Sequence, residues 1–396
     1  MENIIMIIVL SIVLLALGIF MLKKNNGHIL ISVDNIFILF YVVFFGIIFP
    51  VDYVYSLNYS KSNSCLEQIS KYTAAELLLY YLCIVIFLVV FVFAFRTIYR
   101  NKNKSLPHNI YKTKQKKLFV ISVALLIVGV VADLLYLSAY GGYFNYLSYS
   151  GLIRSGVSPI FNRWSFLIAF RGCVCLSSFL LFNLIRTPKI QISRLLLFVF
   201  SFMYSLFILF ADKGRLSFVL YFIMFVLLFV FSKYKKNYVS FKMFALSVVG
   251  VLLFPVFVVF AGQLLSRSTN NDPFYTIVSE TSFVFANFKA IISNGDLYQY
   301  RYFSDLVSFP LFILPSSIWR NMVPHTASDI CTLLITGAFK GTEGVYGESP
   351  CDIISLGFLQ LNLIGVFLTA FVLGFGLGFI FKKINQSKNS QLVFVF

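Results

Sequence analysis

The residues best suited to chemistry in this sequence lie in residues 266–352, the longest interval between its hydrophobic stretches. Arginine binds phosphate oxygens in pairs through its planar fork, histidine titrates near neutral pH, and carboxylates accept protons. The interval holds all three residue types: Arg301, Arg320, His325, Glu348 and Asp352. This combination predicts a site for a phosphorylated ligand, with His325 and Glu348 as the candidate catalytic residues that move a proton.

Further charged residues lie in or beside the hydrophobic stretches, where a charge at the membrane centre costs roughly 2.5–3.5 kcal/mol on insertion scales. One interpretation is a polar cavity that binds pyrophosphate through four cations: Arg171, Arg215, Arg320 and Lys213. Four more residues are secondary candidates for the same site: Arg154, Arg301, Asp133 and Asp352. Arginine suits such a cavity because it keeps its charge when it is partly desolvated.

Each of these residues also has a structural interpretation, which the sequence leaves open. Asp133 and Arg171 would form an ion pair between two membrane helices, and a simple turn would account for residues 212–215. Asp352 lies four residues after Glu348, and both would suit the N-terminus of a helix, where the helix dipole favours negative charge. A single loop histidine such as His325 is often only solvated.

The composition sets the class of protein. Hydrophobic residues make up 59% of the 396 residues and charged residues 12%, with a mean hydropathy of +0.88. A soluble domain cannot hide that much apolar surface, whereas lipid solvates it. We therefore predict an all-α fold, a polytopic helical membrane protein with about nine to ten transmembrane helices and one large outer loop.

The hydrophobic stretches place the predicted spans. They are Ile4–Leu22, a segment within Ile29–Val51 that ends at Pro50, Ala74–Phe95, Leu118–Tyr140, Ser165–Ile185, Leu195–Ala211, Leu216–Ser232, Met243–Leu265 and Ile353–Phe381. The last is longer than the ~20 residues of a simple crossing, so we expect its start to be a separate short helix. The predicted organisation is residues 1–265 with eight spans, 266–352 as the large loop with short helices, and 353–396 with the last span and the start of another.

The orientation follows from the Lys and Arg residues. Most of the 32 lie in the connections after the first, third, fifth, seventh and ninth spans, which the positive-inside rule places in the cytoplasm. The N-terminus and the large loop are then outside. The net charge of +17 is thus a topology signal and does not predict nucleic-acid binding.

Several common chemistries have no support. The sequence has no phosphate-binding P-loop, no dinucleotide fingerprint, no HExxH and no GxSxG motif. Its six cysteines show no metal-binding spacing, so we predict no metal and no other cofactor. Cys331 and Cys351 share the large loop, and in an oxidising compartment they would either form a disulfide or remain free.

The arrangement of spans with one large outer loop before the end resembles that of bacterial O-antigen polymerases, the Wzy-type polymerases of oligosaccharide repeat units. Two stretches carry the resemblance: ADKGRLSF, Ala211–Phe218, and GVYGESPCDIISLGFLQLNLIGVF, Gly344–Phe367. The second is similar to the family's small-residue and acidic approach to a helix with an N-x-x-G step.

This resemblance implies a metal-independent glycosyltransferase of the bacterial inner membrane. It would transfer a growing glycan from undecaprenyl pyrophosphate onto a new lipid-linked repeat unit at the periplasmic face. Its partners would be undecaprenyl-pyrophosphate-linked glycans and membrane lipids, with a chain-length regulator and a flippase as further candidates and no nucleic acid. The alternatives are an O-antigen ligase, or a polysaccharide flippase or other transporter.

Overall fold

The computed structural model describes residues 2–22, 24–25, 28–30, 32–59, 63–99, 111–154, 160, 162–185, 191–212, 217, 221–222, 224–225, 238–239, 273–294, 300–308, 311, 325–340, 342, 345 and 349–386. The chain forms two compact units: Met1–Arg100 with Tyr234–Lys383, and Asn101–Lys233 with Ile384–Phe396. The two units are groups of residues that pack together. The predicted boundaries at residues 265 and 352 instead mark the ends of membrane spans, so the two divisions are not directly comparable.

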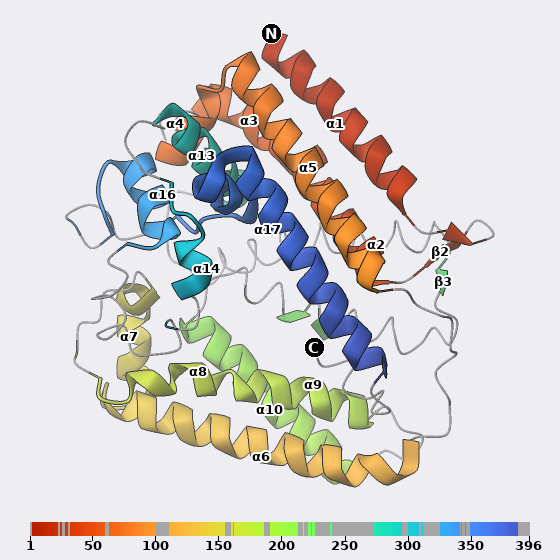
Figure 1. Cartoon of the computed structure of the whole chain (residues 1–396). Coiled ribbons are helices and arrows are strands. Elements are labelled where there is room, and N and C mark those ends of the chain that lie inside the picture. The colour runs from red at the N-terminus through yellow and green to blue at the C-terminus, as the bar shows by residue number, and fades with distance from the viewer. Residues whose placement is uncertain are drawn as a thin grey trace. The chain divides into compact units, whose positions relative to one another are not determined.

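The first unit is built mainly of helices (Figure 1). They are α1 (Glu2–Met21), α2 (Val33–Val43), the π-helical turn η1 (Phe44–Ile48), α3 (Phe49–Tyr59), α4 (Ser64–Ser70), α5 (Ala74–Ile98), α13 (Pro273–Ser293), α14 (Ser304–Ser308), α16 (Ala327–Thr336) and α17 (Ile353–Gln386). Three short antiparallel strands, which the sequence did not predict, complete it: β1 (Lys24–Asn25), β2 (His28–Leu30) and β3 (Tyr238–Val239).

Helices α1, α5 and α17 run in the same direction. At one end Asn3 Nδ2 donates to the carbonyl oxygen of Tyr72 at 3.0 Å, and at the other Arg96 Nη2 donates to that of Met21 at 2.6 Å. Along α17, Gly374 packs on Phe91 of α5 and Gly378 packs on Phe95. These helices correspond to the first, third and ninth predicted spans, for which the charge pattern also predicts one shared direction.

The second membrane helix is longer than predicted. The sequence placed its end at Pro50, but the helix continues through η1 and α3 to Tyr59. Proline lacks an N–H and crowds the preceding turn of an α-helix, and here the wider π-helical turn lies immediately before Phe49–Pro50. The extension carries Asp52, which is buried and accepts a 2.7 Å hydrogen bond from Thr281 Oγ1 of α13.

Helix α13 comes from the predicted large loop, but it packs in the core of the first unit. Phe285, Phe288 and Ile291 are fully buried. Lys289 Nζ lies 2.7 Å from the Glu76 carboxylate on α5, and Tyr72 OH donates to the carbonyl oxygen of Phe285 at 2.8 Å. This part of the interval is therefore a structural element of the bundle.

The second unit contains α6 (Tyr111–Ser138), α7 (Tyr143–Arg154), the 3₁₀ turn η3 (Ser165–Leu167), α8 (Ile168–Arg171), α9 (Cys173–Ile185) and α10 (Ile192–Asp212). Two contacts show that α8 and α9 run antiparallel to α6. Arg171 pairs with Asp133 in the second half of α6, and farther along α9 Ser177 Oγ donates to the carbonyl oxygen of Ser122, in its first half, at 2.8 Å. Gly129 of α6 lies against Val174, which a side chain at 129 would displace.

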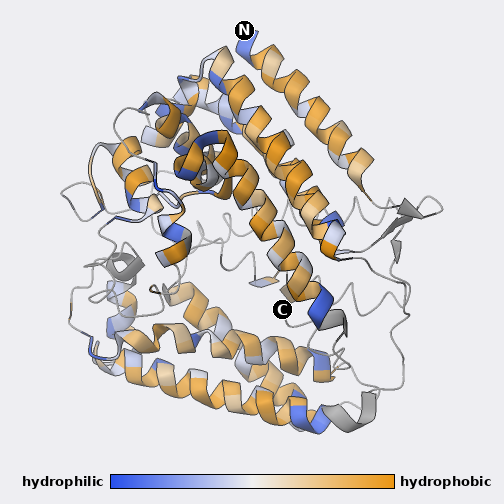
Figure 2. Ribbon diagram, viewed as in Figure 1, coloured by the Kyte–Doolittle hydropathy of each residue, from blue (hydrophilic) through white to orange (hydrophobic). Residues whose placement is uncertain are grey.

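The described residues contain seven helical segments long and apolar enough to cross a membrane. They are Glu2–Met21, Val33–Tyr59, Ala74–Ile98, Gln115–Ser138, Ser165–Ile185, Ile192–Ala211 and Ile353–Lys383. Figure 2 shows hydrophobic residues along most of the length of α1, α5, α6 and α17. The fold is therefore that of an all-α, multi-pass membrane protein. The spans predicted at residues 216–232 and 243–265, and the start of a tenth, fall largely or wholly outside the described residues.

Candidate functional site

The last membrane helix is interrupted near its start, as its length predicted. Within α17, Leu361 (φ −155°, ψ 38°) and Asn362 (φ 57°, ψ −139°) leave helical geometry and separate a short first segment from the long second one. The two segments meet at glycines, because a Cβ on Gly365 would overlap the carbonyl oxygen of Gly357. Only residues without a side chain allow this approach.

The loop before α14 supplies hydrogen bonds to the carbonyls that the break exposes. The backbone N–H of Arg301 donates to the Leu359 oxygen and that of Tyr302 to the Gln360 oxygen, each at 3.3 Å. Tyr302 (φ 46°) and Phe303 (φ 61°) have left-handed backbones, as does Asn362 (φ 57°). Such conformations cost of order 1–3 kcal/mol each in non-glycine residues and concentrate at functional sites. Within the described part of the chain, the three non-glycine residues with positive φ all lie here.

A polar cluster holds this arrangement together. The Arg301 guanidinium donates to both oxygens of Asp305, and its Nη2 also donates to the His325 carbonyl oxygen at 2.8 Å. Asp305 accepts further bonds from Gln360 Nε2 at 2.8 Å and from the N–H of Ala327 at 3.1 Å. We call Arg301, Asp305, His325 and Gln360 the Arg301 cluster. Its carboxylate thereby joins α14, α16 and the break in α17.

Several buried oxygen atoms at the start of α17 have no hydrogen-bond partner among the described residues, among them Gln360 Oε1 and Asp352 Oδ2. The other oxygen of Asp352 caps α17 by accepting from the N–H groups of Ile354 and Ser355, both at 3.0 Å. Burial raises the pKa of the Asp352 carboxyl from 3.8 to about 6, with these hydrogen bonds opposing the rise. Asp352 is therefore both the predicted helix cap and a carboxylate suited to accept a proton near neutral pH.

The predicted catalytic histidine lies at the edge of the same cluster. His325 is exposed and precedes Thr326, which caps α16 by accepting from the N–H of Asp329 at 3.2 Å. Its ring stacks on Phe339, with the centroids 4.3 Å apart and the planes 7° from parallel. The structure thus joins His325, through its carbonyl oxygen, to Arg301 and leaves its side chain accessible.

Cys331 and Cys351 are both free thiols, the second of the two alternatives left open above. The two thiols lie next to each other. A hydrogen bond with the Cys331 thiol raises the pKa of the Cys351 thiol, and burial raises it further.

The second unit contains a separate buried charge cluster. Arg171 Nε lies 2.6 Å from Asp133 Oδ1, and both side chains are almost completely buried. Tyr204 OH donates to the other Asp133 oxygen at 2.6 Å, and the guanidinium lies over the rings of Tyr136 and Tyr146 at 4.6 and 5.4 Å. The structural interpretation, an ion pair between membrane helices, is therefore confirmed. Pyrophosphate binding by Arg171 stays a prediction.

The remaining candidates lie outside the described residues. These are Lys213, Arg215, Arg320 and Glu348, and the side chain of Arg154 at the end of α7. Their assigned roles stay predictions. Within the part of the chain that the structure describes, no group of three or more His, Cys, Asp or Glu side chains is placed to hold a metal ion.

No family model, curated protein or solved structure matches this chain. The candidate site therefore stands on its own geometry. Sequence reasoning missed Asp305 and Gln360, although both left a signal. Asp305 follows Arg301 by four residues, a spacing that brings side chains together on one turn. Gln360 and Asn362 are the two amide side chains in a largely apolar predicted span, and strongly polar residues in such a span are usually functional.

Proposed function

We propose that this protein polymerises undecaprenyl-pyrophosphate-linked oligosaccharide repeat units into O-antigen or a similar surface polysaccharide. The observation that carries the proposal is the Arg301 cluster, which ties the large loop to an interrupted membrane helix. Non-helical backbone at membrane depth is tolerated where it is buried in protein or lines a polar cavity. The proposal includes nine to ten spans in the bacterial inner membrane, with this loop in the periplasm.

The reaction needs three actions from the protein. A hydroxyl oxygen of the acceptor sugar forms a bond to the anomeric carbon of the donor glycan, and the bond from that carbon to undecaprenyl pyrophosphate breaks. The hydroxyl proton passes to a base, and fixed cations stabilise the departing pyrophosphate. Cations in this position supply the charge that a metal ion supplies in other transferases, so the proposed reaction is metal-independent.

The residues divide between these actions. For the proton we assign Asp352, with its buried unbonded oxygen and raised pKa, alongside His325 and Glu348. For the pyrophosphate we assign Arg215 and Arg320, with Lys213 and Arg171 as further cations. Arg301 positions the site, because its guanidinium is engaged by Asp305 and the His325 carbonyl.

A second candidate function has one observation in its favour. Transporters also use interrupted membrane helices, whose broken ends contact the substrate, and α17 is interrupted at Leu361–Asn362. A flippase would move the lipid-linked unit across the membrane without joining units. An O-antigen ligase would transfer the finished glycan to a lipid core and would likewise not lengthen it.

Chain-length analysis in cells separates these functions. The gene is expressed in a strain that makes the matching repeat unit but lacks its own polymerase, and the lipopolysaccharide is resolved on a gel. A polymerase restores a ladder of chain lengths from a starting point of one repeat unit per core. No ladder at normal protein level would reject the proposal. A role as ligase or flippase would instead appear as loss of even the single unit when the gene is deleted from its host.

A further inference from the structure

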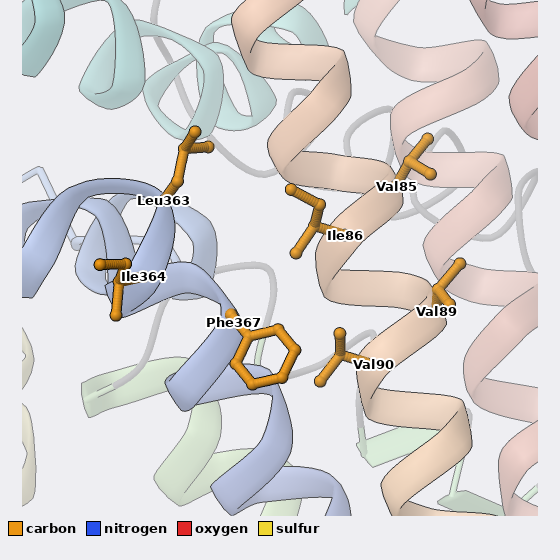
Figure 3. A pocket seen from close by; sticks show the side chains of 7 residues that line it. All are labelled: Val85, Ile86, Val89, Val90, Leu363, Ile364 and Phe367. Atoms are coloured by element: carbon orange, nitrogen blue, oxygen red, sulfur yellow. The ribbon is translucent and has the colours of Figure 1, made fainter.

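An apolar groove opens between α5 and α17 (Figure 3). Its volume is about 560 Å³, within the roughly 300–1,000 Å³ typical of ligand pockets. All of its lining residues are aliphatic or aromatic: Val85, Ile86, Val89, Val90, Leu363, Ile364 and Phe367. Ile364 is 66% exposed and Phe367 is 47% exposed, so the groove is open on the side of the helices. It is therefore accessible from the membrane rather than enclosed in the bundle.

The spacing of the two helices forms the groove. Farther along, glycines let them touch: a Cβ on Gly374 would lie 2.5 Å from the Phe91 carbonyl oxygen, and one on Gly378 would lie 3.0 Å from that of Phe95. Before this contact the facing positions carry larger side chains, and the helices leave a gap. The groove thus has a closed end at Gly374 and extends toward the break in α17.

Its position defines the chemistry of an occupant. Residues 85–90 lie near the middle of the 25-residue helix α5, at the depth of lipid hydrocarbon. The other end begins at Leu363, directly after Asn362, whose Nδ2 donates to Tyr300 OH at 3.5 Å. The polar side chains of Asn362 and Tyr300, which are next to cluster residues Gln360 and Arg301 in the sequence, therefore lie at one end, and purely apolar side chains line the rest. An amphiphile with a polar head and one long apolar chain matches this sequence of surfaces.

We infer that the groove holds the polyisoprenyl chain of the lipid-linked substrate and directs its head group toward the Arg301 cluster. This inference rests on the proposed function, because that function supplies the amphiphile. The chain enters sideways from the bilayer past Ile364 and Phe367 and lies against the branched side chains of α5. The groove selects the substrate by its chain and fixes the depth at which its pyrophosphate stops.

The test compares tryptophan substitutions that fill the groove with matched substitutions outside it. Val89→Trp and Ile364→Trp fill the groove, whereas Leu82→Trp and Val372→Trp stand on the same helices with similar exposure and do not line it. The purified full-length protein is reconstituted with a polyisoprenyl phosphate that carries a photoreactive diazirine on its chain. Labelled peptides are identified by mass spectrometry, with unlabelled polyisoprenyl phosphate or phosphatidylethanolamine as competitor.

We expect labelling of peptides that contain residues 85–90 or 363–367, and competition by polyisoprenyl phosphate only. Each tryptophan in the groove displaces about two or more methylene groups of the lipid chain from contact with the protein. The weaker binding should lower labelling by roughly tenfold when the probe is below saturation. The two matched controls should label like the wild type. Equal labelling of all four variants, or equal competition by phosphatidylethanolamine, would overturn the inference and leave the groove filled by bulk lipid.

The same variants separate this inference from the proposed function. If both groove variants still produce the wild-type ladder, the inference about the groove is wrong and the proposed polymerase function stands. If the groove is labelled specifically but the protein produces no ladder, the inference about the groove is supported and the proposed polymerase function is rejected. Loss of the ladder in the groove variants alone, at normal protein level, supports both.

Discussion

The Arg301 guanidinium donates to both carboxylate oxygens of Asp305, with Nη2 2.8 Å from Oδ1. The same carboxylate accepts from Gln360 at the break in α17 and from the first residue of α16. One carboxylate thereby fixes three elements that lie far apart in the sequence. The geometry of the candidate site depends on it.

Removing this carboxylate should destabilise the protein strongly. Asp305→Ala leaves the mostly buried Arg301 without its counter-ion and Gln360 Nε2 without its acceptor, and breaking a buried pair in this way costs about 3–5 kcal/mol. Glu67→Ala is the matched control, since it breaks an ion pair of the same i,i+4 spacing, Lys71–Glu67, that is largely exposed and contributes about 0–1 kcal/mol. Thermal unfolding in detergent measures both. Equal melting temperatures for the two variants would contradict the role of Asp305.

Glycine at the break should stabilise the protein. Asn362 has φ 57° and ψ −139°, a conformation that glycine adopts without strain, so Asn362→Gly should raise stability by about 1 kcal/mol and retain activity. The control is Asn145→Gly in the helical segment α7, where glycine is a poorer helix former and lowers stability by a few tenths of a kcal/mol. A lower melting temperature for Asn362→Gly would show that the break is not strained.

Replacing Asp352 by Asn should raise stability and lower activity. Because its pKa in the folded protein is raised to about 6 from 3.8, its ionisation destabilises the fold as pH rises through 6. Asp352→Asn keeps an equally good helix cap without the charge, so it should be more stable than wild type above pH 6, by on the order of 3 kcal/mol, and similar below pH 4.

The same substitution should slow transfer by about 10²–10⁴-fold if Asp352 is the base. Wild-type activity should rise with pH through about 6, as the carboxyl ionises. His325→Ala serves as the comparison, because it removes the other described candidate while leaving the cap intact. An Asp352→Asn enzyme with full activity would transfer the role of base to His325 or Glu348.

The Asp133–Arg171 pair can be separated into its structural and chemical roles. Arg171→Ala leaves a buried carboxylate unpaired and should cost about 3–5 kcal/mol, whereas the double change Asp133→Leu with Arg171→Leu should restore most of the stability. If Arg171 also binds pyrophosphate, the double variant folds but makes no polymer. Full activity of the stable double variant would make the pair purely structural.

Much of the fold could be predicted from hydropathy and length, because both record what lipid requires of a helix. The interruption of α17 followed from a span too long for one crossing. The continuation past Pro50 could not be read in the same way. It depends on the π-helical turn at Phe44–Ile48 and on Thr281, which bonds the buried Asp52 from a distant part of the chain.

The candidate site was predictable only in part. The candidates Arg301, His325 and Asp352 followed from residue type and position, and the structure joins Arg301 to His325 through a hydrogen bond. The central role of Asp305 was not predictable, because a carboxylate four residues from an arginine reads as an ordinary surface pair. Its importance comes from Gln360 and Ala327, which the fold brings to it from 55 and 22 residues away.

Reconstitution tests the central claim most directly. The purified protein is placed in liposomes with lipid-linked repeat units of matching structure, in a chelator and with no added metal, and the products are resolved by size. The account predicts a ladder of lengthened lipid-linked glycans from the wild type and none from Asp305→Ala protein that is folded at the assay temperature. A wild-type protein that leaves every repeat unit single, whether or not it moves them across the bilayer, would contradict it.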